Sequence, residues 1–195
     1  MTSGPFANLI INLGPVSLEL PGGTVAAPGS LGGLAYNPRC LRRDLTDAIL
    51  RRYAHADAVL AAIRGSPDVA TFQTAVQGVP GSGDIGIHGG GHYSLGGDPG
   101  RDFFTSSGDP AFYLHHGMMD RVWWMWQAQG GGRAAGPGAI AGTGTFLDQP
   151  PSEEVKIGDW VDLGWAPTEG PRGEGRRIVG DLLSTVAGPF CYVYV

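Results

Sequence analysis

Residues 108–127 read GDPAFYLHHGMMDRVWWMWQ and carry the clearest local signals in the chain. Asp109 can accept hydrogen bonds from free backbone amides at a helix start, and Pro110 needs no amide partner in the first turn. Large side chains then recur at spacings of three and four, which places on one helical face Phe112, His116, Met119, Trp123 and Trp126. Three glycines at 130–132 end the pattern. The stretch therefore predicts an amphipathic helix from about residue 109 to residue 129.

Two histidines stand side by side in this predicted helix, and two more precede it. His115 and His116 would point about 100° apart, so the apolar periodicity selects only His116 for the buried face. His88 and His92, in IHGGGHYSLGG, are four residues apart and would share one face of a helix. Three neutral imidazoles suit zinc, copper, iron or nickel. A metal site is one interpretation; a glycine-rich loop and a hydrogen-bonded core histidine are the alternatives.

The three glycines between His88 and His92 disfavour a helix. Each costs a helix interior about 0.8–1 kcal/mol relative to alanine, and three cost about 2.5–3 kcal/mol. A helix here needs stabilisation from outside, which a metal held by both imidazoles would supply. We expect the missing side chains to leave open space beside the ion for a flat substrate. Asp120, one turn after His116, either orients an imidazole or pairs with Arg121 at the surface.

Further helices are expected upstream. Residues 41–63 have helical periodicity and form either two short helices broken near 54–57 or one long helix. Ser66 can cap another helix with Pro67 in its first turn, and Gly78 would end it.

Strand signals are few and short. The alternation of polar and apolar residues at 16–20 suits a strand, and the apolar segments at 155–165 and 190–195 suit strands or packed coil. Residues 130–150 form a Gly/Ala/Thr-rich loop. The chain as a whole predicts a mainly α fold with long irregular loops and a few short strands.

Composition excludes some classes of partner. The 34 glycines and 15 prolines indicate many loops, but 42% hydrophobic content is enough to fill a core. A net charge of −5 excludes a broad basic face for nucleic acid. No stretch approaches the roughly 20 apolar residues of a membrane helix, and the first residues lack the basic region of a signal peptide, which leaves localisation open. Cys40 and Cys191 are expected to form one bridge or to remain two buried thiols.

The segment from Asp109 to Arg121 resembles the second-copper signature of tyrosinases and catechol oxidases. His88 and His92 stand where that family has the first two ligands of the same copper. The stretches NLGPVSLELPGG, NPRCLRRD and the closing CYVY are similar to fungal members, so the resemblance extends over nearly the whole chain. It implies copper held by His88, His92 and His116, with His115 and Phe112 beside the ligands and Asp120 in the surrounding shell. The implied reaction oxidises o-diphenols to o-quinones with dioxygen, and many members also hydroxylate monophenols.

The resemblance also implies a site that is incomplete in these residues. The family holds two coppers with six histidines, and this sequence has five. We therefore expect residues 1–195 to be the second-copper half of a catalytic domain, part of an antiparallel four-helix bundle, without the first-copper half or the C-terminal lid. Such a chain would bind one copper and show little or no activity.

Two further positions bear on substrate and water. Gly89 follows the first ligand, where strong monophenol hydroxylases often carry asparagine. Gln77 stands where a water-orienting glutamate is common, and an amide cannot act as a carboxylate base. Both are candidates for positioning substrate or water, and the substitutions disfavour hydroxylation.

Two other functions are compatible with the sequence. Without the first-copper helices, the apolar face of 109–129 would be exposed, so the chain could assemble with a partner that supplies them or with itself. A three-histidine zinc hydrolase is also permitted by the ligand chemistry, but the motif offers no carboxylate base between its histidines.

Overall fold

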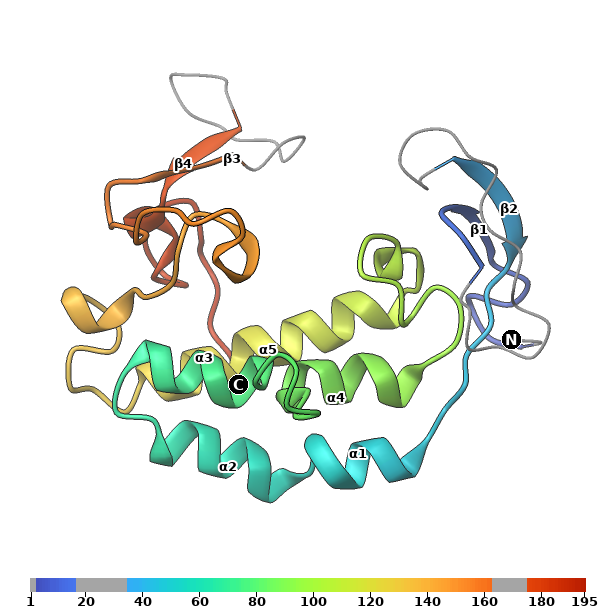
Figure 1. Cartoon of the computed structure of the whole chain (residues 1–195), viewed down its shortest axis with the longest axis horizontal. Coiled ribbons are helices and arrows are strands. Elements are labelled where there is room, and N and C mark those ends of the chain that lie inside the picture. Colours follow the sequence, from blue (N-terminus) through green and yellow to red (C-terminus); the bar gives the residue numbers. More distant parts are fainter. Residues whose placement is uncertain (1–2, 17–34, 163–174) are drawn as a thin grey trace. The chain divides into compact units, whose positions relative to one another are not determined.

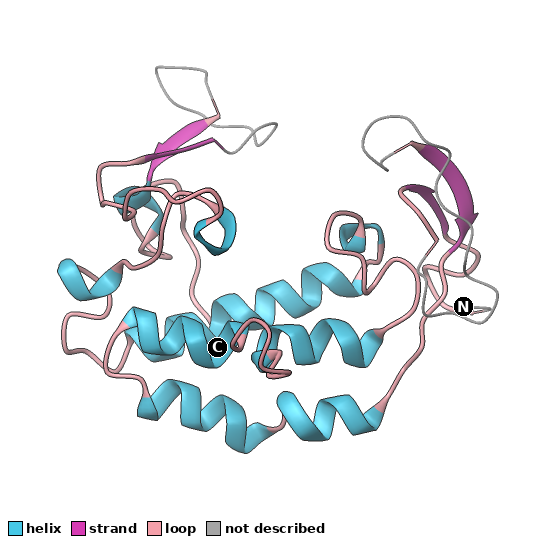
Figure 2. Ribbon diagram, in the orientation of Figure 1, coloured by secondary structure: helices cyan, strands magenta, loops and turns pink. Residues whose placement is uncertain are grey.

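The computed structural model describes residues 3–16, 35–162 and 175–195. Its longer elements are helices, as Figure 1 shows: α1 (Asp47–Tyr53), α2 (Ala56–Gly65), α3 (Val69–Gln77), α4 (Gly86–Leu95) and α5 (Ala111–Gln127). Strands are short and form two antiparallel pairs (Figure 2): β1 (Ile10–Leu13) with β2 (Tyr36–Cys40), and β3 (Trp160–Asp162) with β4 (Arg176–Ile178). Single turns of 3-10 helix lie at η2 (Ser106–Gly108), η3 (Pro137–Ala139), η4 (Phe146–Asp148) and η5 (Val179–Leu182). The expected mainly α fold with long loops and a few short strands is confirmed.

The chain divides into two compact units. The first comprises Met1–Ala61 and Thr74–Asp120, and the second comprises Ala62–Gln73 and Arg121–Val195. The boundaries fall inside helices α2, α3 and α5.

Two ion pairs with buried carboxylates connect segments of the first unit that are distant in sequence. Arg39, on β2, donates from Nε and Nη2 to the carboxylate of Asp98 at 2.6 and 2.8 Å. Arg43 binds Asp109 in the same two-pronged way, at 2.8 and 2.6 Å. Asp109 also accepts the backbone N–H of Ala111 at 2.8 Å, which confirms its predicted place at the start of α5. The position of α5 therefore depends on a carboxylate that caps the helix and binds an arginine from a distant loop.

In the second unit, the core centres on Trp126. Its side chain is fully buried, stacks on Phe72 with ring centroids 4.8 Å apart, and donates its indole N–H to the carbonyl of Ser66 at 2.9 Å. Ser66 thus serves as a backbone acceptor and does not cap α3. Asp68 takes that position, because its Oδ1 accepts the N–H of Thr71 at 2.8 Å. The helix accordingly begins at Val69, later than the sequence pattern predicts.

The predicted faces and boundaries of the other helices agree with the structure. Along α5, Trp126 is buried, and the other members of the predicted face are partly buried: Phe112, His116, Met119 and Trp123. Of the two alternatives for residues 41–63, the broken one is found, since α1 ends at Tyr53 and α2 begins at Ala56.

Other predictions are corrected or lie outside the described residues. Cys40 and Cys191 are both free and exposed, so neither expected state, bridged or buried, is found. Of the strand expected at 16–20, residues 17–20 lie outside the described residues, as do 163–165 of the segment at 155–165. Among the described helices, none has the length and apolar character needed to cross a bilayer.

Candidate metal centre

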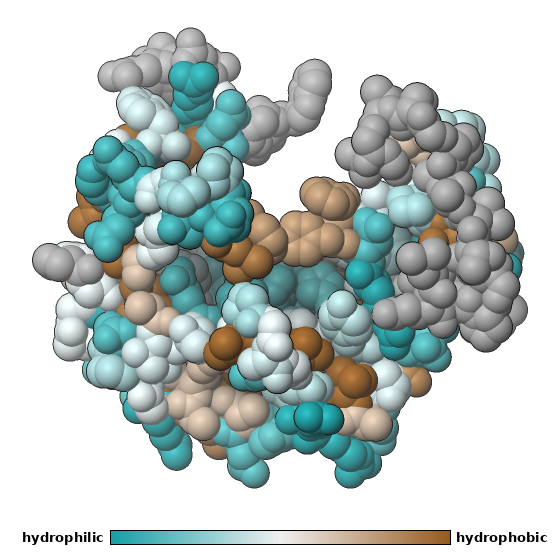
Figure 3. All heavy atoms as spheres, viewed as in Figure 1, coloured by the Kyte–Doolittle hydropathy of each residue, from teal (hydrophilic) through white to brown (hydrophobic). Residues whose placement is uncertain are grey.

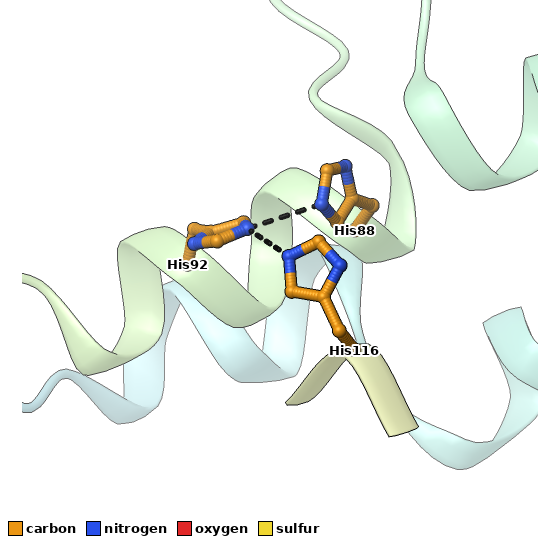
Figure 4. Close-up of side chains that lie close together, drawn as sticks. All are labelled: His88, His92 and His116. Atoms are coloured by element: carbon orange, nitrogen blue, oxygen red, sulfur yellow. Dashed lines mark hydrogen bonds between the residues drawn. The ribbon is translucent and has the colours of Figure 1, made fainter. Parts of the chain in front are cut away.

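Three imidazoles from two helices meet at one point. His88 and His92 come from α4, and His116 comes from α5 (Figure 4). Nε2 of His92 lies 3.0 Å from Nε2 of His88 and 3.2 Å from Nε2 of His116. The three ring nitrogens all lie within 4.8 Å of one another, so the structure brings together the three histidines selected from the sequence.

Helix α4 forms despite its three glycines. The missing side chains let neighbouring groups pack closely against the backbone of the helix, and this packing stabilises it. A Cβ on Gly90 would lie 2.8 Å from Cβ of Tyr53 and 3.0 Å from Cβ of Ala54, at the end of α1. A Cβ on Gly91 would lie within 3.0 Å of three ring atoms of His115. A Cβ on Gly89 would likewise lie 2.9 Å from Cβ of Ile85, so the expected open space for a substrate is wrong at all three glycines. Gly90 and Gly91 allow α1 and His115 to approach the backbone of α4.

Hydrogen bonds fix how two of the rings present their nitrogens. Nδ1–H of His88 donates to Oε1 of Gln77 at 2.9 Å, because an amide oxygen can only accept. In the neutral ring this leaves Nε2 of His88 with a lone pair directed at the other imidazoles. His115 donates Nε2–H to the backbone carbonyl of His88 at 2.9 Å. The Nε2 of His115 is therefore engaged with the backbone of α4 and not with the three converging nitrogens.

The cluster favours neutral imidazoles. Burial, and then the neighbouring histidines, lower the pKa of His88 to about 4. The pKa of His92 is also lowered to about 4, again mainly by burial and then by His115 and His116. Burial likewise lowers the pKa of His115 and of His116. At neutral pH the rings are uncharged and can donate lone pairs to a cation.

The donor set fits a transition-metal ion. Nitrogens bound about 2.0–2.1 Å from one ion in tetrahedral geometry are about 3.3 Å apart, close to the two separations found here. Nε2 of His92 carries one hydrogen at most and can donate to only one of its two neighbours at these distances. A cation bound by all three nitrogens would satisfy them together. Three imidazoles are compatible with copper as well as zinc.

The other candidate residues differ in whether they contact the three histidines. Phe112 stacks on His116 with ring centroids 4.0 Å apart and also approaches His92 at 5.9 Å. Gln77, the last residue of α3, is exposed but contacts His88 directly. Gly89 is half-buried against Ile85 of the preceding turn. Asp120 lies one turn after His116 and is half-buried; its role toward the imidazoles stays a prediction.

Sequence reasoning missed two features of this site. It did not connect Arg43 to the start of α5, and it treated Gly91 only as a missing side chain. Two sequence features could have indicated these contacts, namely the two arginines at 42–43 and the three consecutive glycines at 89–91. Neither feature shows which distant residue it contacts. The fifth histidine, His55, is exposed, and its Nδ1 accepts the N–H of Ala58 at 3.3 Å at the start of α2.

Comparisons with known proteins agree on one family. Residues 1–129 match the family model of the common central domain of tyrosinase. The chain is 37% identical over 194 residues to tyrosinase P of Aspergillus terreus, covering 98% of this chain and 50% of the relative. It is 33% identical to the N-acetyl-6-hydroxytryptophan oxidase ivoB of Emericella nidulans, covering 98% and 51%.

A solved structure of a polyphenol oxidase variant from Thermothelomyces thermophila is also similar. It is 41% identical with a TM-score of 0.81, over 100% of this chain and 51% of that one. The chain therefore spans about half the length of the relatives it matches.

Proposed function

Because this chain belongs to the tyrosinase family of oxidoreductases, we propose that it holds one copper through His88, His92 and His116 in a centre that oxidises o-diphenols with dioxygen. The observation that carries the proposal is the convergence of three Nε2 atoms from α4 and α5 in a chain of this family. In the overall reaction, two o-diphenols lose four electrons and four protons to give two o-quinones, and one dioxygen becomes two waters.

In this proposal copper and the protein have different roles in the reaction. Copper would supply electron exchange between the phenol and dioxygen, which side chains alone cannot provide. The protein keeps three imidazoles neutral, and Gln77 holds the Nδ1 proton of His88 so that Nε2 remains free to bind. Phe112 stacks on the ring of His116, with centroids 4.0 Å apart, and restricts its rotation. These contacts preorganise the ligands before the metal arrives.

One copper per chain is the expected stoichiometry. A family centre with two coppers needs six histidines, and these 195 residues contain five, of which His55 is engaged at a helix start elsewhere. We therefore propose that residues 1–195 are the second-copper half of a tyrosinase domain. Alone, they would turn over catechols slowly or not at all.

The test is copper content measured together with activity. The purified chain is loaded with copper, dialysed and analysed for metal per chain, and catechol and phenol are then offered in the presence of dioxygen. We expect about one copper and little oxidation of either substrate; the variant His55→Asn should behave as the wild type does. A wild-type chain that returns to background copper after dialysis would contradict the metal site. Two coppers with steady catechol oxidation would contradict the half-site.

An assembly function is the second candidate. The apolar face of 109–129 that was expected to be exposed is buried at Trp126 and partly buried at its other members, so that expectation is wrong, but a different face of α5 is exposed. Leu114 and Met118 stand one turn apart and are 79% and 49% exposed, and Tyr113 beside them is exposed as well. Figure 3 shows hydrophobic side chains at the surface of the helical part of the molecule. Such a face suits a chain that supplies the other three histidines. Sedimentation of the same copper-loaded sample tests assembly of the chain with itself, because only an assembly exceeds the 20.3 kDa of the single chain. Assembly with a different chain is tested by co-purification of a second, histidine-rich chain from the source.

Gln77 provides a prediction that does not depend on turnover. Replacing it with leucine removes the acceptor for Nδ1–H of His88, so the proton can move to Nε2 and block the lone pair. Loss of such a partner typically weakens metal binding about 10–100-fold, and we expect a loss in that range for Gln77→Leu. Competition with a chelator measures the affinity. Glutamate at this position still accepts the hydrogen bond, so copper affinity in Gln77→Glu should be at least that of the wild type; equal losses in both variants would argue against the role.

A further inference from the structure

The imidazole ring of His115 lies against the backbone of Gly91, in the space that a side chain at position 91 would occupy. The flat ring lies so close to the backbone of α4 that a Cβ on Gly91 would come within 3.0 Å of three of its atoms. No rotation of an alanine methyl relieves such a contact, because Cβ is fixed by the backbone. Any side chain at position 91 therefore has to displace the ring or push the helices apart.

The same ring contacts both ligands on α4. Its Nε2–H donates to the carbonyl of His88 at 2.9 Å. The ring lies nearly parallel to that of His88, with centroids 5.5 Å apart, and edge-on to that of His92, at 4.8 Å. The next residue along α5 is the third ligand, His116. A shift of His115 therefore moves the two halves of the cluster relative to each other.

We propose that His115 is a positioning residue: seated on Gly91, it sets the spacing of α4 and α5 at which the three ligand nitrogens meet. The inference rests on the proposed copper site and adds a steric requirement to it. It explains why a glycine occupies the one helical position directly under the ring. It also assigns a task to a histidine that lies among the ligands without contributing a nitrogen to them.

A double-mutant cycle tests the pair. Gly91→Ala, His115→Ala and the double variant are compared with the wild type by copper affinity, measured by chelator competition at a temperature where circular dichroism shows every variant folded. We expect each single change to weaken copper binding by about tenfold or more, in the range typical of groups that support metal ligands. In the double variant, Gly91→Ala should add no further loss, because the ring it would strike is gone.

The outcomes separate this inference from the function on which it rests. A wild-type chain that binds no copper defeats the proposed function. A wild type that binds copper, with Gly91→Ala costing the same factor in both backgrounds, overturns only the role of His115. If Gly91→Ala alone does not fold, recovery of its helical signal by His115→Ala becomes the measured rescue, and failure to recover it counts against the pair. Gly117→Ala is the matched control, since a Cβ there meets nothing within 4 Å and should leave affinity unchanged.

Discussion

Replacing Arg43 with methionine is expected to lower the free energy of unfolding by about 3–5 kcal/mol, the usual cost of removing one partner of a buried ion pair. The side chain of Asp109 is only 2% exposed, and Arg43 donates to both of its carboxylate oxygens. Without the guanidinium, a buried charge keeps only the amide of Ala111 as a described hydrogen-bond donor. Methionine retains much of the volume of the arginine stem, so the loss reports mainly on charge.

The chain contains a matched pair for comparison. Arg51 and Asp47 form an ion pair one turn apart on α1 through a single contact of 3.0 Å, and their side chains are 79% and 76% exposed. Arg51→Met should therefore cost about 0.5 kcal/mol or less, because water screens exposed pairs. Chemical denaturation followed by circular dichroism measures both variants in the metal-free protein. Equal effects would show that neither burial nor the two-pronged contact governs the contribution of the Arg43–Asp109 pair.

A second substitution, at Asp109, tests whether the unpaired carboxylate causes the loss of stability in Arg43→Met. In the double variant Arg43→Met/Asp109→Asn the buried charge is absent, while asparagine still accepts the amide of Ala111 as a helix cap. We expect this variant to be more stable than Arg43→Met alone. If the double variant were less stable by the sum of two losses, the arginine would act through packing and not through the carboxylate.

Helix α5 shows what the sequence can predict about this fold. Its cap, its apolar period and its terminal glycines are all local, and Gly130–Gly132 do adopt the left-handed conformations expected after a helix. For residues 41–63 local signals indicated helix but left one long helix and two short ones open, and the structure has the two short ones, α1 and α2. Local signals were not sufficient for β1 and β2, which pair residues some thirty positions apart in register, such as Ile10 with Cys40. Strand pairing of this kind depends on contacts that no short window contains.

Helix α4 shows the opposite case. Propensity alone disfavours three consecutive glycines, and the helix forms because Gly90 and Gly91 allow close contact with α1 and with His115. The spacing of His88 and His92 indicated the helix, but the reason for the glycines lay in elements about 35 residues upstream and 24 residues downstream. The convergence of His88, His92 and His116 was therefore predictable, whereas the contacts that position them were not.

Replacing His92 with alanine should have the largest effect on the metal. Its Nε2 is the nitrogen that lies within 3.2 Å of both other candidate ligands, so its loss leaves two imidazoles and a gap between them. We expect copper affinity to fall by more than about 100-fold, beyond the range seen for groups that only support ligands. Isothermal titration or chelator competition measures the change.

Stability gives an independent readout of the same prediction. A ligand at about 100 times its dissociation constant stabilises the folded state by about 2.7 kcal/mol, so copper should raise the melting temperature of the wild type clearly. The same copper concentration should leave His92→Ala almost unshifted. His55→Asn removes a histidine but keeps an acceptor for the amide of Ala58, and it should respond as the wild type does. A copper affinity of His92→Ala within tenfold of that of the wild type would contradict a metal site on α4. His88 would then be the one candidate ligand left on that helix.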